Sequence, residues 1–143
     1  MATKSENTST KTSEYSTKAQ AFWTHPLNLG PMLRPDGYAR VVGECSDVME
    51  FYLRIQNNRI IESRFDTDGC AATVSAGSMA VALSQGKTLD EAESITAQDI
   101  LDGLDGLPKD HEHCARLAAT TLRMALADAR KLAKEPWKKQ YRH

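Results

Sequence analysis

The segment from Val48 to Gln56 alternates apolar and polar side chains, and this period of two is typical of a β-strand with one buried face. One side of the strand is polar or amphipathic, while the other is continuously apolar. The predicted core face comprises Met49, Phe51, Leu53 and Ile55. Because a shift of one residue would move this whole set to the solvent face, the pattern fixes how the strand can be placed.

Two further strands are predicted beside this one. Asn57-Asn58 forms a two-residue turn of a kind that tolerates left-handed backbone angles, so Arg59 to Thr67 returns antiparallel to the first strand. On this returning strand, Ile61, Ser63 and Phe65 share one side. Tyr38 to Val42 supplies a short strand upstream. The three runs together predict an antiparallel β-meander.

The second half of the chain changes to a helical pattern. Ala71 to Gln85 is rich in small and apolar residues and stops at Gly86, while Thr88 and Thr96 each open a short helix, the first through a capping box. Glu112 to Lys134 is the longest helix. Its predicted buried stripe comprises Ala118, Leu122, Ala125, Ala129 and Leu132. Strands followed by helices predict an α+β domain with the helices on one face of the sheet.

The polar ends and the overall charge set the limits of the domain and its surroundings. Residues 1–14 hold almost nothing apolar and are expected to be disordered, residues 15–133 form the domain, and residues 134–143 form a basic tail. A net charge of -1 gives no reason to expect nucleic acid or an anionic membrane as a partner. Neither a secretory signal nor a membrane span is recognisable, so we expect a cytoplasmic protein.

The cysteines are the strongest chemical signal. There are three, far apart in the sequence, and an odd number in a reducing compartment argues against a disulfide framework. Cys45 lies in a predicted loop, whereas Cys70 and Cys114 lie at predicted helix N-termini. Free N–H groups and the helix dipole at those positions favour the thiolate, which is the form that binds metal or attacks sulfur.

Two further metal donors stand beside the cysteines. Asp47 follows Cys45 by two residues, and His113 precedes Cys114 directly. Three thiolates with a histidine or a carboxylate make a four-coordinate set suited to an iron–sulfur cluster or to zinc. A single cysteine is more often a packing residue, but three at element junctions favour a shared site. His25 and His111 are interpreted as surface or loop histidines.

These residues resemble those of the NifU/IscU-type scaffold domain. The matching pieces are Cys45-Ser-Asp47, Thr67-Asp-Gly69-Cys70 before a small-residue helix, Gly86-Lys-Thr88-Leu-Asp-Glu91-Ala, and His113-Cys114. The resemblance implies the α+β fold and a scaffold, not an enzyme. Such a scaffold receives persulfide sulfur from a cysteine desulfurase, assembles a [2Fe–2S] cluster from iron and sulfur, and passes it to apo recipient proteins.

The resemblance also implies roles for individual residues. Cys45, Cys70 and Cys114 would be the cluster ligands, with Cys114 or Cys45 as first sulfur acceptor and Asp47 or His113 as fourth ligand. Isolated members can hold zinc through the same side chains, and we expect a monomer or a weak homodimer. Two alternatives stay open: a zinc-bound sulfur acceptor that never holds a cluster, and a binding module with a purely structural zinc.

The sequence departs from the family pattern at two places. Ser46 stands where the family usually has glycine, so we expect a stiffer loop and a displaced Asp47. The chaperone-binding segment of the housekeeping branch, Leu-Pro-Pro-Val-Lys, is replaced by Leu107-Pro-Lys-Asp-His111. Handover of a cluster by that dedicated chaperone is therefore not expected.

Overall fold

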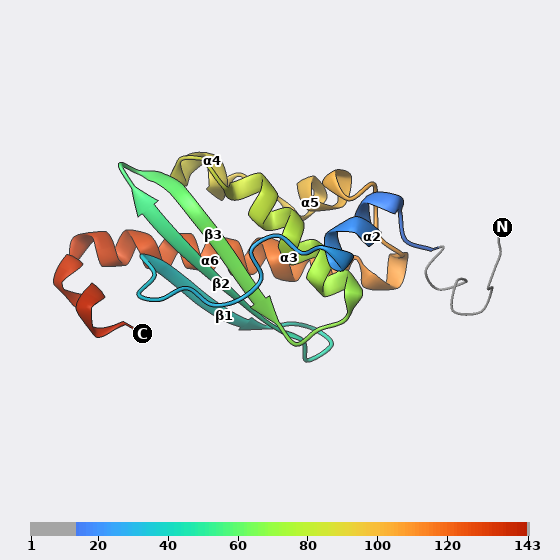
Figure 1. The fold of residues 1–143 in the computed structure, drawn as a ribbon, viewed down its shortest axis with the longest axis horizontal. Coiled ribbons are helices and arrows are strands. Elements are labelled where there is room, and N and C mark those ends of the chain that lie inside the picture. The colour runs from blue at the N-terminus through green and yellow to red at the C-terminus, as the bar shows by residue number, and fades with distance from the viewer. Residues whose placement is uncertain (1–13, 143) are drawn as a thin grey trace.

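A three-stranded antiparallel sheet forms one layer of the molecule. The computed structural model describes residues 14–142, so the predicted tail of residues 1–14 lies, except for Glu14, outside the described residues. The strands are β1 (Gly37–Val42), β2 (Val48–Gln56) and β3 (Arg59–Thr67), in the order β1-β2-β3 (Figure 1). Asn57 and Asn58 take φ angles of 54° and 61° in the turn between β2 and β3. The predicted meander is confirmed.

A β-bulge in β3 changes which of its residues face the core. Arg54 pairs with Glu62, but the next residue of β2, Ile55, pairs with Ile60, so Ile61 has no partner across the strands. Ile60 is therefore fully buried, while Ile61 is 51% exposed. The prediction that Ile61 shares a side with Ser63 and Phe65 is wrong for this reason, although those two are both buried.

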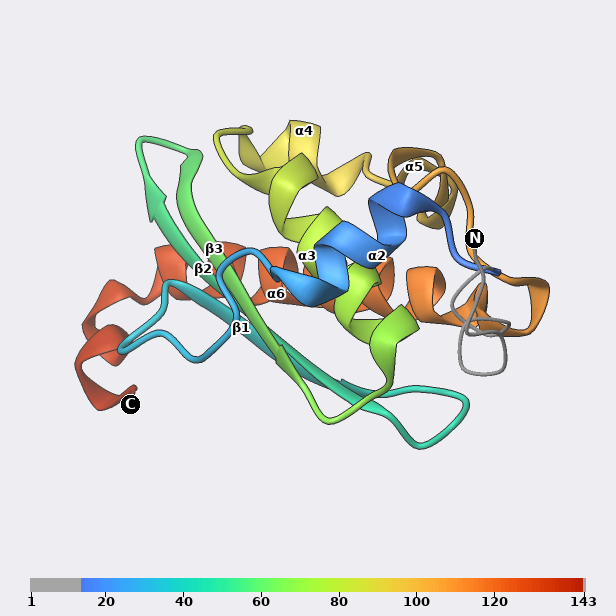
Figure 2. The same ribbon diagram turned by 45° about the vertical axis from the view of Figure 1, so that its right-hand side comes forward.

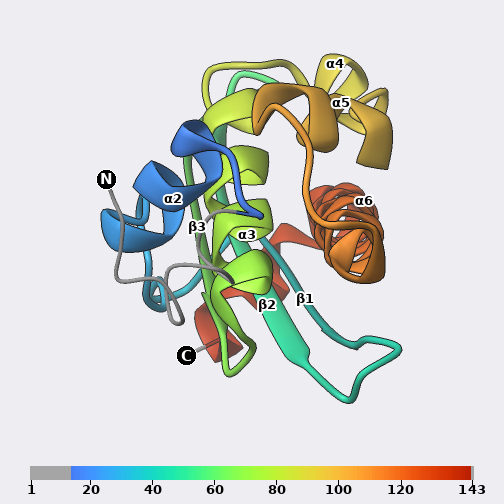
Figure 3. The ribbon, with the colours of Figure 1, turned by 90° about the vertical axis from the view of Figure 1, so that its right-hand side faces the viewer.

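Two helices cover one face of the sheet, as predicted. α6 (His113–Lys134) packs on β1 and β2, while α3 (Ala71–Ser84) packs on β3. α3 lies between α6 and a short helix, α2 (Thr17–Thr24), as Figure 3 shows. The close approach of α3 to the sheet depends on Gly77, since a Cβ at this position would lie 2.3 Å from the Phe65 ring. All five residues of the predicted stripe on α6 are buried.

Short capped helices connect α3 to α6. α4 (Leu89–Glu93) and α5 (Ala97–Gly103) each begin with a complete capping box, made by Thr88 with Glu91 and by Thr96 with Asp99. A single-turn 3₁₀ helix, η1 (Lys109–His111), then leads directly into α6. This turn therefore positions His113 and Cys114, the last two predicted site residues, at the start of α6.

The basic C-terminal segment folds back on the domain. A 3₁₀ helix, η2 (Pro136–Tyr141), follows α6, and Arg142 then forms an ion pair of 2.7 Å with Asp128. Lys139 lies 2.8 Å from Asp36. Figure 2 shows this segment and the β1–β2 loop at opposite ends of the molecule. No helix among residues 14–142 is both long and apolar enough to cross a bilayer.

Candidate functional site

The loop between β1 and β2, the start of α3 and the start of α6 lie at the same end of the molecule (Figure 1), and each of them carries one of the three cysteines. Cys45 lies in the loop between β1 and β2, Cys70 is the N-cap residue of α3, and Cys114 lies in the first turn of α6. Cys45 and Cys70 are exposed, whereas Cys114 is fully buried. The site therefore has an accessible rim and an enclosed floor.

One threonine hydroxyl joins three of the predicted site residues. Thr73, fully buried in the first turn of α3, donates a hydrogen bond of 2.7 Å to the Asp47 carboxylate. The same oxygen lies 3.4 Å from the Cys114 sulfur and 3.7 Å from the Cys70 sulfur. The Thr73 hydroxyl therefore contacts the Asp47 carboxylate and both sulfur atoms.

Gly69 makes this arrangement possible. A Cβ at this position would lie 2.6 Å from the Thr73 hydroxyl oxygen and 2.8 Å from an Asp47 oxygen. A larger residue at position 69 would therefore displace the carboxylate or the hydroxyl.

His113 connects the third cysteine to the others. Its Nε2 atom lies 3.2 Å from the Cys45 sulfur and 3.8 Å from the Cys114 sulfur. His113 thus connects the β1–β2 loop, which carries Cys45, to the start of α6, which carries Cys114.

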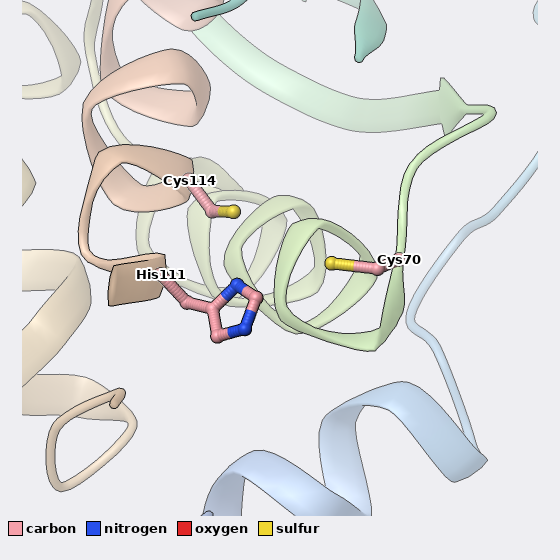
Figure 4. Close-up of side chains that lie close together, drawn as sticks. All are labelled: Cys70, His111 and Cys114. Carbon is pink, nitrogen blue, oxygen red and sulfur yellow. The ribbon is translucent and has the colours of Figure 1, made fainter. Parts of the chain in front are cut away.

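A second histidine, His111, reaches the site, although the sequence suggested only a surface or loop residue. Cys70, His111 and Cys114 each offer a ligand atom, and these atoms all lie within 4.8 Å of one another. Figure 4 shows the two sulfur atoms pointing toward each other, with a ring nitrogen of His111 directed into the space beside them. The group does not contain Cys45, Asp47 or His113. The structure therefore places the sulfur atoms of Cys70 and Cys114 close together. The Cys45 sulfur contacts the His113 ring instead.

Burial dominates the chemistry of Cys114. Loss of solvent raises the pKa of its thiol to about 11, and the nearby Cys70, Asp47 and Cys45 raise it further, while the hydrogen-bond contact between Cys114 and Thr73 lowers it. The prediction that its helix N-terminal position favours the thiolate is therefore wrong for the metal-free protein. A metal ion would have to displace this proton, as metals do when they bind thiols.

The loop that carries Cys45 and Asp47 adopts a conformation suited to glycine. Ser46 has a φ angle of 65°, in the left-handed region, and its N–H bonds to the Gly43 carbonyl at 3.1 Å. The Gly43 N–H in turn bonds to the Asp47 carbonyl at 2.7 Å. Ser46 therefore adopts a backbone conformation that glycine adopts at lower cost. The Asp47 side chain is nevertheless hydrogen-bonded to Thr73.

The donor set fits a soft or borderline metal. Thiols and imidazoles are the ligands that zinc and iron–sulfur centres use in proteins, and a neighbouring carboxylate adds a hard oxygen donor. These groups come from the β1–β2 loop, the start of α3 and the segment from η1 into α6. Fold and site together define a small α+β domain with a thiol-rich site that is assembled from three distant segments and whose donors could hold a metal ion.

Comparison with known proteins places the chain within a family. Residues 14–135 match the model of the NifU-like N-terminal domain, and the chain belongs to this family. It is 40% identical over 115 residues to iron–sulfur cluster assembly scaffold protein IscU 1 of Archaeoglobus fulgidus, covering 80% of this chain and 75% of that protein. It is 34% identical over 119 residues to the scaffold protein IscU of Escherichia coli K12, covering 80% and 92% respectively.

Solved structures show the same fold. A protein of Fervidobacterium islandicum AW-1, assigned to the SUF system as an iron–sulfur cluster assembly scaffold, superposes with a TM-score of 0.69 at 18% identity, covering 80% of this chain and 97% of that one. The N-terminal part of a NifU-like protein of Brucella abortus gives a TM-score of 0.58 at 21% identity, with coverages of 85% and 95%.

Proposed function

We propose that this protein is a scaffold on which iron–sulfur clusters are assembled before they pass to other proteins. The observation that carries the proposal is the convergence of three cysteines from three separate segments on one corner of the fold. A cluster there is cargo, so its ligands must be strong enough to hold it and exposed enough to release it. Membership of the family and relatives named as IscU scaffolds support this function.

Each residue has a role in this proposal. Cys45, Cys70 and Cys114 bind the iron atoms of a [2Fe–2S] cluster, and their spread from exposed rim to buried floor leaves one side of the cluster open. Asp47 or His113 completes the set, and a carboxylate beside sulfur ligands favours release because it is a harder donor. The sulfur comes from a cysteine desulfurase as persulfide, and the finished cluster goes to apo recipient proteins. The scaffold itself is not a catalyst, and we expect it to act in the cytoplasm.

Anaerobic reconstitution tests the proposal. The protein is incubated with ferrous iron and sulfide, and the cluster chromophore, iron and acid-labile sulfide are measured per chain. Cys70→Ser is expected to abolish the chromophore while leaving the circular dichroism spectrum unchanged, because Cys70 is exposed and packs little. Thr121→Ser is the control, since Thr121 is buried on α6 away from the site.

Two results would contradict the proposal. The first is a wild-type protein that acquires no acid-labile sulfide under conditions in which it binds iron. The second is a Cys70→Ser variant that forms the chromophore as fully as Thr121→Ser does.

A second function is favoured by the compact group of Cys70, His111 and Cys114. Three nitrogen and sulfur donors within 4.8 Å suit a zinc ion, which would leave the protein as a sulfur acceptor that relays persulfide without holding a cluster. Zinc that stays bound in the presence of excess ferrous iron and sulfide would favour this function over the scaffold.

A further inference from the structure

The two outer edges of the sheet differ in how their backbone groups are satisfied. On β3, the residues whose N–H and C=O groups point away from β2 include Ile60, Ser63 and Phe65. Each of these three residues donates a hydrogen bond to, and accepts one from, the segments 28–30 and 85–87. An edge whose hydrogen bonds are already formed offers no template for a further strand. The β3 edge is therefore closed at these residues.

The β1 edge is open over its second half. The Tyr38 N–H points away from β2, because it bonds to the Asp128 carboxylate on α6 at 2.9 Å, whereas the Gly43 N–H bonds inward across the β1–β2 hairpin. Since inward and outward groups alternate along an antiparallel strand, the N–H and C=O groups of Arg40 and Val42 also point outward. Their outward N–H groups have no hydrogen-bond partner within residues 14–142. Figure 3 shows no other described segment along this free side of β1.

A groove lies beside this open edge. It separates the end of β1 from the flank of α6, and its lining includes Val42, Leu117 and Thr120. Met124 lies one helical turn after Thr120 and one before Asp128, so it belongs to the same flank of α6. Val42 is 56% exposed and Met124 is 51% exposed. An open strand edge beside an apolar groove is the arrangement with which domains bind an extended peptide as an additional strand.

Charge selects the kind of strand that fits this edge. Arg40 forms no ion pair within residues 14–142, and Glu50, directly across from it on β2, accepts a hydrogen bond from Tyr38. An added strand places a residue about 4.8 Å from Arg40, about twice as far from Glu50, and further still from Asp66 on β3. A carboxylate at that position is attracted more strongly than it is repelled, because the Coulomb energy falls with distance.

A second copy of this chain fits the edge less well. Two β1 strands that run antiparallel and are centred on Arg40 would place the two arginines directly opposite each other. Like charges in directly opposed positions destabilise a pair of strands. The charge of the edge therefore favours a different chain with an acidic residue over a second copy.

We propose that the β1 edge binds an extended segment of another protein as a fourth strand, with an acidic residue opposite Arg40 and apolar residues opposite Val41 and Val42. The segment runs antiparallel to β1, because it can then exchange both backbone bonds with Arg40 and with Val42. The groove ends beside His113, so a partner bound there lies next to the thiol-rich site. Binding of the segment uses no cysteine and is independent of whether the site holds a cluster.

A peptide titration followed by NMR tests the proposal. The probes are the acetylated and amidated peptide Thr-Val-Val-Glu-Val-Thr and the same peptide with lysine in place of glutamate. In the free protein, the Arg40 and Val42 amides should exchange with solvent at least about tenfold faster than those of Ala39 and Val41, which bond to β2. The glutamate peptide should slow exchange at Arg40 and Val42 by at least about fivefold and bind at least about fivefold more tightly than the lysine peptide. Equal affinities for the two peptides, or no protection by the glutamate peptide at millimolar concentration, would overturn the proposal.

Two substitutions separate the contribution of charge from that of backbone pairing. Arg40→Glu should reverse the preference, so that the lysine peptide binds at least about fivefold more tightly than the glutamate peptide. Val42→Pro removes an outward N–H and should weaken binding of the glutamate peptide by at least about fivefold. Val42→Ala keeps the N–H and is the matched control, expected to bind within about threefold of wild type. Circular dichroism verifies that each variant is folded. An unchanged preference in Arg40→Glu would overturn the proposal, even if Val42→Pro did not fold.

Pairing between two copies would be visible without any peptide. In that case the Arg40 and Val42 amides would become protected as the protein concentration rises, and analytical ultracentrifugation would show a dimer that Val42→Pro abolishes. We expect the exchange of both amides to be independent of protein concentration. Protection that increases with concentration would assign the edge to a second copy and overturn the proposal.

Discussion

The two ends of α6 carry polar groups of opposite kinds. Toward its C-terminal end, the Asp128 carboxylate accepts hydrogen bonds from the Arg142 guanidinium at 2.7 and 3.3 Å and from the Tyr38 N–H at 2.9 Å. At its N-terminal end, Cys114 lies near thiols, a carboxylate and an imidazole. Like Cys114, these groups are either acidic or able to act as metal ligands. The C-terminal end therefore holds groups of opposite charge that pair with each other. The N-terminal end holds several groups of the same kind, which are acidic or able to bind metal.

This difference separates structural polar groups from functional ones. The opposite charges at the C-terminal end neutralise each other, so they need nothing from outside the chain. At the N-terminal end, burial is the main cause of the raised pKa of Cys114, and the nearby Cys70, Asp47 and Cys45 raise it further because they oppose its negative charge. The same neighbours would attract a cation placed among them.

The largest effect is expected from Thr73→Val. Valine keeps the shape of threonine but removes the hydroxyl that donates to Asp47 and contacts both thiols. We expect zinc affinity to fall by about tenfold to a hundredfold, as it does when an outer partner of a metal ligand is lost. The measurement is a chelator competition titration. Thr73→Ser should retain the wild-type affinity because it keeps the hydroxyl, and equal affinities for the valine and serine variants would refute the role given to Thr73.

A smaller effect, and of a different kind, is expected from Asp128→Ala. Loss of the ion pair and of the bond to Tyr38 N–H should lower the free energy of unfolding by about 1.5 kcal/mol, measured by denaturant titration. Arg142→Ala should cost less, because it leaves the bond to Tyr38 intact. Zinc affinity should stay unchanged in both variants, and a loss of affinity in either would break the contrast between the two ends of α6.

The smallest effect is expected from Ser46→Gly. Glycine relieves the cost of the left-handed conformation, but it also increases the entropy of the unfolded chain, so the two contributions largely cancel. We expect stability to change by about 0.5 kcal/mol or less in the stabilising direction, measured by thermal unfolding. A destabilisation of more than about 1 kcal/mol would mean that the serine side chain supports the loop.

Local patterns predicted the elements of the fold well. The alternation in Val48–Gln56, the Asn57-Asn58 turn and the capping residue Thr88 each act within a few neighbouring residues, so the sequence alone determines their effect. The bulge at Ile61 could not be predicted in this way. It depends on the register between two strands, which the pattern of one strand does not fix.

The site was predicted in part, for a similar reason. The positions of Cys45, Cys70 and Cys114 at element junctions were correct, and the structure places Asp47 and His113 beside them. That these residues bind metal stays a prediction. Thr73 and His111 were missed, although each lies three residues from a cysteine on a helical turn, which is a usable signal. The high pKa of Cys114 could not be predicted, because burial is a property of the whole fold.

The origin of the thiol-rich site in three distant segments would link its occupancy by a metal ion to folding. Because the donors meet only in the folded state, a bound ion stabilises that state by mass action, by about 2.7 kcal/mol at a free concentration one hundred times the dissociation constant. The stability of the fold would then depend on how much of the protein holds a bound ion. If the proposed function holds, a protein that has delivered its metal or cluster would unfold at a lower temperature, so a thermal scan would report whether the molecule is loaded or empty.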